Sequence, residues 1–371
     1  MKTKVAYLDY SLHFAGAERA LYTIISNLDR KRFEPIIVFP FPCEHHHRYD
    51  DLSCEKLYLS DGIKWWMGSD RWKKPIRGTD FVKRTIFGYR LAKFLSSKGI
   101  KILHVNLLRP NSLMWIWFCK KFGIKVVGHF RSLSLDWVPS KMVQQRCGAI
   151  ISVSKIVRDH AMTKYKHPNN ITVYDSIAFS RSPLCYSKKN VISSVAVLSP
   201  HKGHDNAIVA FDKIAAKYPD YELYIVGGEV IQGEMKRLKG IASVTRCSKR
   251  IRFTEKQVDD IDKYYQESKL ILSLTKTGEA FGLVPFEAAL CGTPTIAPNK
   301  GAITELLEDG ISGILVETLD VDAIADRIDW ALSNYDESVE IAAKTLDVIE
   351  NRLSPESMTA QIMDVYSQLL R

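Results

Sequence analysis

Short apolar runs alternate with amphipathic stretches along the first half of the chain. After the first run, Ala20, Leu21, Ile24, Ile25 and Leu28 recur at the spacing of one helical face. Short buried strands that alternate with helices are typical of parallel sheets built from β–α–β units. The expected strands of this half are Val5–Leu8, Pro35–Phe39, Lys101–Val105, Lys125–Gly128 and Ala149–Val153.

The alternation is interrupted by a polar stretch at residues 180–192 and then starts again. We therefore expect an α/β protein with two doubly wound domains, over residues 1–185 and 190–350, with a last helix at 355–371 packing back on the first. Ligands of such sheets bind at the carboxyl ends of the strands, where the strand order reverses. The expected strands of the second half are Ser194–Leu198, Glu222–Val226, Leu270–Leu274 and Thr293–Ala297.

Composition narrows the class of protein further. Apolar residues make up 46% of the 371 residues and charged residues 25%, which excludes a disordered chain or a small disulfide scaffold. The seven cysteines are odd in number and form no CxxC pair, as expected for a reduced, cytoplasmic protein. The densest apolar run, Leu113–Cys119, falls short of the ~20 residues of a membrane-spanning helix. We expect a protein that is soluble or at most peripheral on a membrane.

The net charge of +10 is concentrated in the first domain. Residues 1–187 carry 31 Lys+Arg and 14 Asp+Glu, a net charge of +17, so the rest of the chain carries −7. Within residues 64–101, eleven Lys and Arg residues alternate with tryptophan, phenylalanine and tyrosine. Such a segment suits an anionic membrane surface or nucleic acid, and an ordinary solvated basic face is the simpler alternative.

The strongest local motif is the run GEAFGLVPFEA at residues 278–288. Gly282 allows a close approach of the backbone to a ligand, and the free N–H groups where a helix starts can bind a phosphate. Glu279 and Glu287 could each accept hydrogen bonds from the two hydroxyls of a vicinal diol. Alternatively, the two carboxylates only complement the dipole of the helix that follows.

This run, extended to GEAFGLVPFEAALCGTPTIA, resembles the E-x7-E region of retaining glycosyltransferases of the large GT4-type group. Four further segments resemble segments of the same family and occur in the same order along the chain: Gly16–Arg19, Val126–His129, the stretch from Ser154, and Ser199–Asp205. The resemblance implies the GT-B fold, in which two Rossmann-like, doubly wound parallel-sheet domains face a central cleft.

For the second domain, the resemblance implies a binding site for a nucleoside-diphosphate sugar. Glu279 would bind hydroxyls of the donor sugar, and Glu287 would bind the ribose diol. Lys202 would neutralise the diphosphate as negative charge develops on the leaving group. The backbone N–H groups of Gly282, Leu283 and Val284 would contact the same diphosphate.

For the first domain, the resemblance implies that Gly16 lets a loop close over the phosphates and that His129 contacts the donor sugar. Asn106, at the end of a strand, could contact the acceptor. The family usually carries an arginine just before the SPxKG loop, where this chain has Val197. Arg131, two residues after His129, is our hypothesis for the missing phosphate-binding cation.

The resemblance implies a metal-independent hexosyltransferase without a cofactor that moves sugar to a lipid-linked or glycan acceptor with retention. Its expected role is in cell-surface polysaccharide synthesis, such as lipopolysaccharide or capsule. The expected location is the inner face of the cytoplasmic membrane, contacted through residues 64–101, and no nucleic-acid partner is expected. The alternatives are a GT-B-fold sugar-nucleotide epimerase and a basic nucleic-acid or anion-binding protein without transferase activity. A dinucleotide oxidoreductase would need G-x-G-x-x-G after the first strand, and Ser11–Gly16 lacks it.

Overall fold

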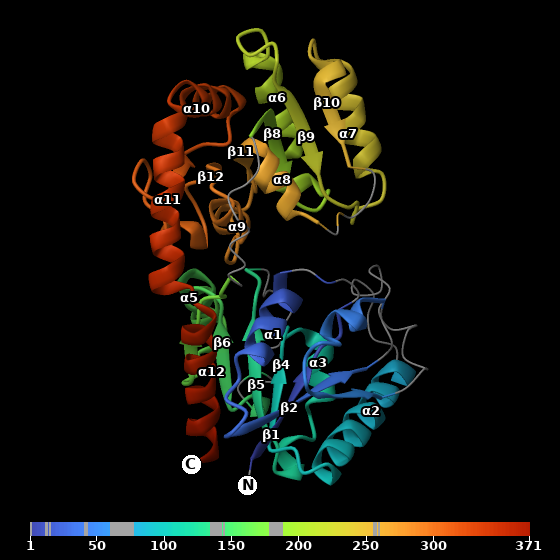
Figure 1. Cartoon of the computed structure of the whole chain (residues 1–371). Coiled ribbons are helices and arrows are strands. Elements are labelled where there is room, and N and C mark those ends of the chain that lie inside the picture. The colour runs from blue at the N-terminus through green and yellow to red at the C-terminus, as the bar shows by residue number, and fades with distance from the viewer. Residues whose placement is uncertain are drawn as a thin grey trace. The chain divides into compact units, whose positions relative to one another are not determined.

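The chain forms two compact units in a computed structural model (Figure 1). The structure describes residues 2–11, 14, 16–40, 44–59, 78–133, 143, 145–177, 188–254, 258 and 260–371. The first unit comprises Met1–Ser176 together with Ser354–Arg371, and the second unit comprises Ile177–Leu353. The first domain was expected to end at residue 185, which lies among residues 178–187, outside the described residues. The observed division, after Ser176, lies next to this segment.

The first unit is built on a seven-stranded parallel sheet in the order β3-β2-β1-β4-β5-β6-β7. Its strands are β1 (Thr3–Leu8), β2 (Phe33–Phe39), β3 (Glu55–Tyr58), β4 (Ile102–Val105), β5 (Lys125–Phe130), β6 (Ala149–Ser152) and β7 (Asn170–Thr172). Its helices are α1 (Gly16–Ser26), α2 (Gly78–Ser97), α3 (Pro110–Trp115), α5 (Lys155–Tyr165) and α12 (Pro355–Leu370), with short 3-10 turns η1 (Glu44–Tyr49) and η4 (Lys120–Phe122).

The central strands of the first unit are buried on both faces, which explains why they read as continuous apolar runs. On one face, Val5 and Tyr7 of β1 pack in a single cluster with the apolar side of α1 and with Met358 and Ile362 of α12. The C-terminal helix is therefore part of the core of the first unit, although nearly two hundred residues separate it from β7 in the sequence.

The second unit repeats this design with six parallel strands in the order β10-β9-β8-β11-β12-β13. Its strands are β8 (Lys189–Val195), β9 (Glu222–Val226), β10 (Ile251–Phe253), β11 (Ser268–Leu272), β12 (Thr295–Pro298) and β13 (Ile314–Val316). Its helices are α6 (His204–Ile214), α7 (Glu234–Ser243), α8 (Asp262–Glu267), α9 (Val284–Leu290), α10 (Val321–Ser333) and α11 (Tyr335–Arg352), with 3-10 turns η5 (Pro200–Lys202), η6 (Ser248–Arg250) and η7 (Ala302–Glu305).

The expected fold class, two doubly wound parallel α/β sheets, is confirmed. One strand was placed wrongly: β8 starts at Lys189, inside the stretch expected to be a linker, and ends at Val195 rather than at Leu198. The reason is that Ser193 and Ser194 interrupt the apolar pattern although both are buried. The Ser193 Oγ lies 2.7 Å from the Ser268 Oγ of β11, so the two hydroxyls satisfy each other.

In each sheet, successive strands are first added on one side and then on the other, so the strand order reverses at one point. In the first unit the reversal lies between β1 and β4, and in the second it lies between β8 and β11. The loops after these strands leave the sheet on diverging paths, which makes this edge the usual ligand site of an open α/β sheet. In this chain the loops at these edges begin at Asp9, Asn106, Ala196 and Ser273.

Candidate functional site

In the second unit, the loop after β8 rests directly on the backbone that follows β11. Gly203 has a φ of +75°, and a Cβ atom at this position would lie 2.1 Å from the carbonyl oxygen of Leu274. The Lys276 N–H also donates a 2.7 Å hydrogen bond to the His201 carbonyl. Only glycine allows this approach, so the loop that carries Lys202 is fixed against the loop that carries Glu279.

Lys202 and Glu279 form an ion pair at this contact. The Lys202 Nζ lies 2.6 Å from the Glu279 Oε1, and the Thr275 hydroxyl donates to the same oxygen. The two side chains are 21% and 26% exposed. Burial alone would raise the pKa of Glu279, but the Lys202 charge and the hydrogen bonds outweigh it, so this pKa lies below its usual value. Glu279 is therefore a carboxylate near neutral pH.

The backbone around Glu279 is held by two neighbouring glycines. A Cβ atom on Gly301 would lie 2.7 Å from the Glu279 N atom, and a Cβ atom on Gly282 would lie 3.3 Å from the Glu279 Oε2. Both glycines have positive φ values. The Ala302 N–H closes the contact by donating to the Glu279 carbonyl at 3.0 Å. These contacts fix the carboxylate just before α9.

Helix α9 starts at Val284, after Gly282 and Leu283, as the motif predicted. In this first turn Pro285 has no N–H group, and the Phe286 and Glu287 N–H groups donate to the Leu283 carbonyl at 3.1 Å and 3.0 Å. An N–H group at the very start of a helix, as at Val284, has no carbonyl acceptor within the helix. Glu287 lies in this turn, and its Oε2 accepts a 2.8 Å hydrogen bond from the Tyr265 hydroxyl. Lys202 thus follows β8, and Glu279 and Glu287 follow β11, the two strands between which the strand order of the second sheet reverses.

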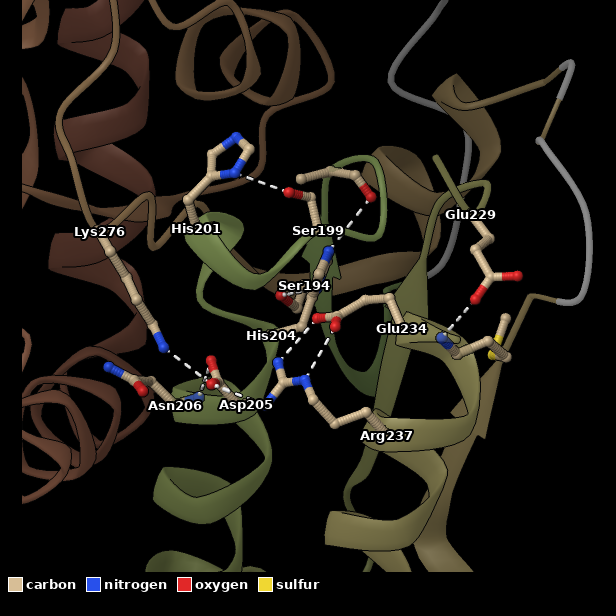
Figure 2. A network of polar contacts seen from close by, with 12 residues as sticks. Ser194, Ser199, His201, His204, Asp205, Asn206, Glu229, Glu234, Arg237 and Lys276 are labelled. Atoms are coloured by element: carbon tan, nitrogen blue, oxygen red, sulfur yellow. Dashed lines mark hydrogen bonds and ion pairs between the residues drawn. The ribbon is translucent and has the colours of Figure 1, made fainter. Parts of the chain in front are cut away.

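A polar network extends from this site (Figure 2). Lys276 and Arg237 approach the same Asp205 oxygen, at 2.8 Å and 3.3 Å. Burial would raise the pKa of Asp205, but hydrogen bonding and the charge of Lys276 lower it. Sequence reasoning missed this cluster. The available signal was charged residues of both signs at the starts of two helices, at Asp205 and at Glu234 and Arg237, and in the loop at Lys276.

His204, the neighbour of Asp205, has a structural role in the second unit. Its Nδ1 lies 2.8 Å from the Ser194 hydroxyl, and its Nε2 lies 3.2 Å from the Ala196 carbonyl oxygen. Burial lowers the pKa of His204 to about 4, so the ring is neutral and acts as a spacer between β8 and the start of α6.

In the first unit, His129 is fully buried near the end of β5. Its Nδ1 atom lies 3.2 Å from Arg131 Nη2 and 3.2 Å from His104 Nε2. Burial lowers the pKa of His129 well below the usual value, and the positive charge of Arg131 adds to this effect. His129 is therefore neutral at physiological pH.

Arg131 is engaged within the first unit. Its Nη1 forms an ion pair with Asp175, and its Nε donates a 3.0 Å hydrogen bond to the Asn106 carbonyl. Its side chain is 4% exposed. The hypothesis that Arg131 replaces the family's phosphate-binding arginine stays a prediction, whereas its visible contacts hold His129 and the end of β4.

Asn106 directly follows β4, and its side-chain amide donates a 3.0 Å hydrogen bond to the Ala17 carbonyl of α1. Among the described residues its buried Oδ1 has no hydrogen-bond partner. Together with Asp9 and Glu18 it lines a small cavity at the ends of β1 and β4. Gly16 begins α1 at the same edge, and the residue before it is outside the described residues.

Among the described residues, no group of three or more His, Cys, Asp and Glu side chains is arranged to hold a metal ion. No described helix combines the length and the apolar character needed to cross a membrane.

Comparisons with known proteins agree with this architecture. The family described as glycosyl transferases group 1 matches residues 175–346, and glycosyltransferase family 4 matches residues 14–174. The chain therefore belongs to the GT4-type glycosyltransferases. The D-inositol 3-phosphate glycosyltransferase of Mycobacterium sp. (strain KMS) is 31% identical over 159 residues, which span 42% of this chain and 35% of that relative.

Two longer matches complete the picture. The phosphatidyl-myo-inositol mannosyltransferase of Mycolicibacterium smegmatis is 29% identical over 314 residues, or 79% of this chain and 78% of that protein. The crystal structure of Anabaena Alr3699/HepE in complex with UDP and glucose superimposes with a TM-score of 0.79 at 18% identity, covering 98% of this chain and 99% of that one. The fold of this chain is accordingly the GT-B fold.

Proposed function

We propose that this protein transfers a hexose-type sugar from a nucleoside-diphosphate sugar to a glycan or lipid-linked acceptor. The observation that carries the proposal is the Lys202–Glu279 pair, seated by Gly203 where the second sheet reverses. A cation and a carboxylate in one place suit a ligand that joins a diphosphate to a sugar. The names of the relatives, which include a mannosyltransferase and a protein bound to UDP and glucose, support the same class of substrate.

The donor would be held by groups of the second unit. The diphosphate takes Lys202 and the N–H groups of Gly282, Leu283 and Val284 as partners, and Glu279 accepts hydrogen bonds from sugar hydroxyls. Glu287 binds the ribose diol. In the first unit, His129 contacts the sugar, Gly16 gives the first loop room to approach the phosphates, and Asn106 contributes to acceptor binding.

Cleavage of the sugar–phosphate bond leaves an oxocarbenium-like centre and adds negative charge to the departing diphosphate. Lys202 and the fixed N–H groups stabilise that charge as it develops, which lowers the barrier without a metal ion or another cofactor. For a retaining enzyme, the acceptor hydroxyl attacks from the face that the diphosphate leaves. A diphosphate oxygen then takes the hydroxyl proton, and no protein carboxylate acts as the base.

The exposed side of α2 supports a membrane-associated acceptor. Val82, Ile86 and Tyr89 are 54%, 47% and 41% exposed and follow one another at the spacing of a single helical face, which continues into Lys93. Trp117 of the same unit is 41% exposed as well. Apolar and aromatic residues beside cations suit an anionic bilayer surface. Residues 64–77 of the basic aromatic segment lie outside the described residues. We therefore propose that the enzyme acts at the cytoplasmic membrane, in cell-surface polysaccharide synthesis.

The proposal is tested by a thermal-shift screen against UDP-, GDP- and ADP-linked sugars, followed by product analysis. The true donor should raise the melting temperature, and turnover should release a nucleoside diphosphate and form a glycoside. Lys202→Met and Glu279→Gln should each lower kcat at least 100-fold. Lys213→Met is the matched control, because it removes only a surface ion pair with Asp322 in the same unit.

Three results would contradict the proposal. An epimerised nucleotide sugar as the product indicates an epimerase. Steep salt-dependent affinity for nucleic acid without any response to nucleotide sugars indicates a nucleic-acid-binding protein. Folded Lys202 and Glu279 variants that keep full activity exclude the site.

A further inference from the structure

Tyr265 connects two helices of the second unit beside the proposed donor site. It lies in the last turn of α8, and its hydroxyl donates a 2.8 Å hydrogen bond to Oε2 of Glu287 in the first turn of α9. Tyr265 is 1% exposed, so its hydroxyl needs a partner inside the protein, and Glu287 supplies one. Because a carboxylate is a strong acceptor, this bond holds the Glu287 side chain in one orientation before any ligand binds.

The ring of Tyr265 is fixed by the packing of the second unit. It belongs to a buried cluster with Val195 of β8, Ile271 of β11 and Ala288 of α9. Helix α8 ends directly before β11 begins, and the side chains of a helix tilt toward its N-terminus. This tilt carries the Tyr265 hydroxyl away from the end of α8 and to the first turn of α9, which starts after β11.

Lys188 fixes the other ends of the same two helices. Its Nζ donates to the Tyr265 carbonyl at 3.2 Å and to the Cys291 carbonyl at 3.1 Å, and the Thr293 hydroxyl also donates to the Tyr265 carbonyl. A cation at the C-terminal end of a helix is favourable, because the last carbonyl groups have no partner within the helix. Tyr265 is accordingly held at its backbone and at its ring, and its hydroxyl has a fixed position relative to Glu287.

An oriented carboxylate suits a pair of neighbouring hydroxyl groups. Each oxygen of a carboxylate can accept more than one hydrogen bond, so Oε2 of Glu287 can take a ligand hydroxyl in addition to Tyr265. A side chain that is already held in place loses little freedom when the ligand binds, which strengthens binding. A ligand without the hydroxyls loses hydrogen bonds to a charged group, and one such bond changes affinity about 10–100-fold.

We propose that Tyr265 is a positioning residue, which orients Glu287 for the two hydroxyls of a ribose and so makes the donor site selective for nucleotides with an intact ribose diol. The identity of the ligand rests on the proposed function, in which Glu287 binds that diol, whereas the hydrogen bond and the packing of Tyr265 do not. Because Tyr265 is buried, it acts through Glu287 and without a contact of its own to the nucleotide.

Titration calorimetry with UDP, GDP and their 2′,3′-dideoxy forms measures this selectivity. The wild type should bind the ribose form of its nucleotide at least about 10-fold more tightly than the dideoxy form. Tyr265→Phe keeps the buried ring and removes the hydroxyl, so binding of the ribose form should weaken about fivefold and binding of the dideoxy form should stay unchanged. Tyr224→Phe is the matched control, because it removes a 3.2 Å hydrogen bond to Glu222 on β9 and should change neither affinity.

Glu287→Ala completes a double-mutant cycle. It should abolish the preference for the ribose diol, and Tyr265→Phe should have no further effect on that preference in the Glu287→Ala background, since the two residues act as a unit. A purely structural role of Tyr265 would weaken the ribose and dideoxy forms equally. That result, like a preference that Tyr265→Phe leaves unchanged, overturns the positioning role.

Two further results separate this proposal from the proposed function. A wild type that binds UDP or GDP no more tightly than the dideoxy form overturns the selectivity without any variant, while the donor site itself stands. A wild type that binds none of these nucleotides, or a Glu287→Ala variant that keeps the full preference for the ribose diol, refutes the proposed donor site instead.

Discussion

Replacement of Gly203 by alanine tests how the second unit places Lys202 beside Glu279. The substitution forces an L-residue to a φ of +75° and brings its Cβ within 2.1 Å of the Leu274 carbonyl oxygen. Cβ contacts below 3.0 Å essentially do not occur, so one of the two backbones must retreat by about 0.9 Å. Left-handed backbone costs about 1 kcal/mol. With the displaced strand end, we expect a total loss of about 3 kcal/mol.

Gly233→Ala provides the matched control in the same unit. Gly233 has a φ of +89° but would place its Cβ in open space, so only the backbone strain of about 1 kcal/mol applies. At about 2–4 °C per kcal/mol, Gly203→Ala should melt about 6–12 °C below the wild type by calorimetry, and Gly233→Ala about 2–4 °C below it.

The same displacement should affect the ligand. A shift of about 0.9 Å moves Lys202 away from the position where it would meet the diphosphate, and an ammonium–phosphate hydrogen bond lengthened by that much lies outside hydrogen-bond range. Titration calorimetry with UDP and GDP, below the melting temperature, should show about tenfold weaker binding in Gly203→Ala alone. Our reasoning is refuted if the two glycine variants lose equal stability and bind the nucleotide equally well.

Three other predictions use separate features. Val197 lies two residues after β8 and is 41% exposed, so Val197→Arg should be tolerated. The added cation should tighten UDP or GDP binding about 3–10-fold in titration calorimetry, and unchanged affinity argues against a cation site there. Burial lowers the pKa of Lys188 from 10.5 to about 8, so between these two pH values the unfolded chain binds more protons than the folded one. The free energy of unfolding of the wild type should therefore rise with pH relative to that of Lys188→Met, as measured by denaturant titrations. A difference between the two proteins that does not change with pH contradicts this. A double change of Ile86 and Tyr89 to serine should reduce sedimentation with anionic vesicles at least threefold, while serine at the 84% exposed Val244 should not.

The central strands could be predicted from the sequence because burial on both faces makes them continuous apolar runs. The edge strands of the first sheet could not. β7 has three residues that are all only partly buried, and β3 has exposed residues at both ends. Such segments resemble loops because their side chains are partly exposed to water. The start of β8 was missed for another reason, since its two serines are buried as a hydrogen-bonded set that no hydropathy pattern reveals.

The candidate site likewise contains residues that could be predicted from the sequence and residues that could not. Lys202, Glu279 and Glu287 could be found because the chain places them in a contiguous motif or next to a glycine turn. The contacts of Asp175 and Tyr366 could not, because each has a partner that is distant in the sequence. Asp175 lies 44 residues from Arg131, and Tyr366 lies 262 residues from His104. These contacts depend on the packing of the first unit rather than on local spacing.

Glu279 and the diphosphate of the proposed donor compete for Lys202. Two other lysines of the second unit, Lys276 and Lys300, already hold Asp205 and the Lys276 carbonyl, at 2.8 Å and 2.6 Å. Lys202 is instead paired with the carboxylate proposed to bind the sugar. A diphosphate that attracts Lys202 therefore releases Glu279 for sugar hydroxyls, but bare UDP or GDP leaves that released carboxylate without a new partner.

Glu279→Gln should accordingly affect the two kinds of ligand in opposite directions. Removal of the negative charge frees Lys202, so affinity for bare UDP or GDP should rise about 3–10-fold, which is about 0.7–1.4 kcal/mol. Affinity for the intact nucleotide sugar should fall, because an amide accepts fewer hydrogen bonds than a carboxylate. Titration calorimetry with both ligands, with Lys213→Met as the reference variant, measures this reversal. Parallel changes for both ligands would mean that the ion pair does not compete with the diphosphate.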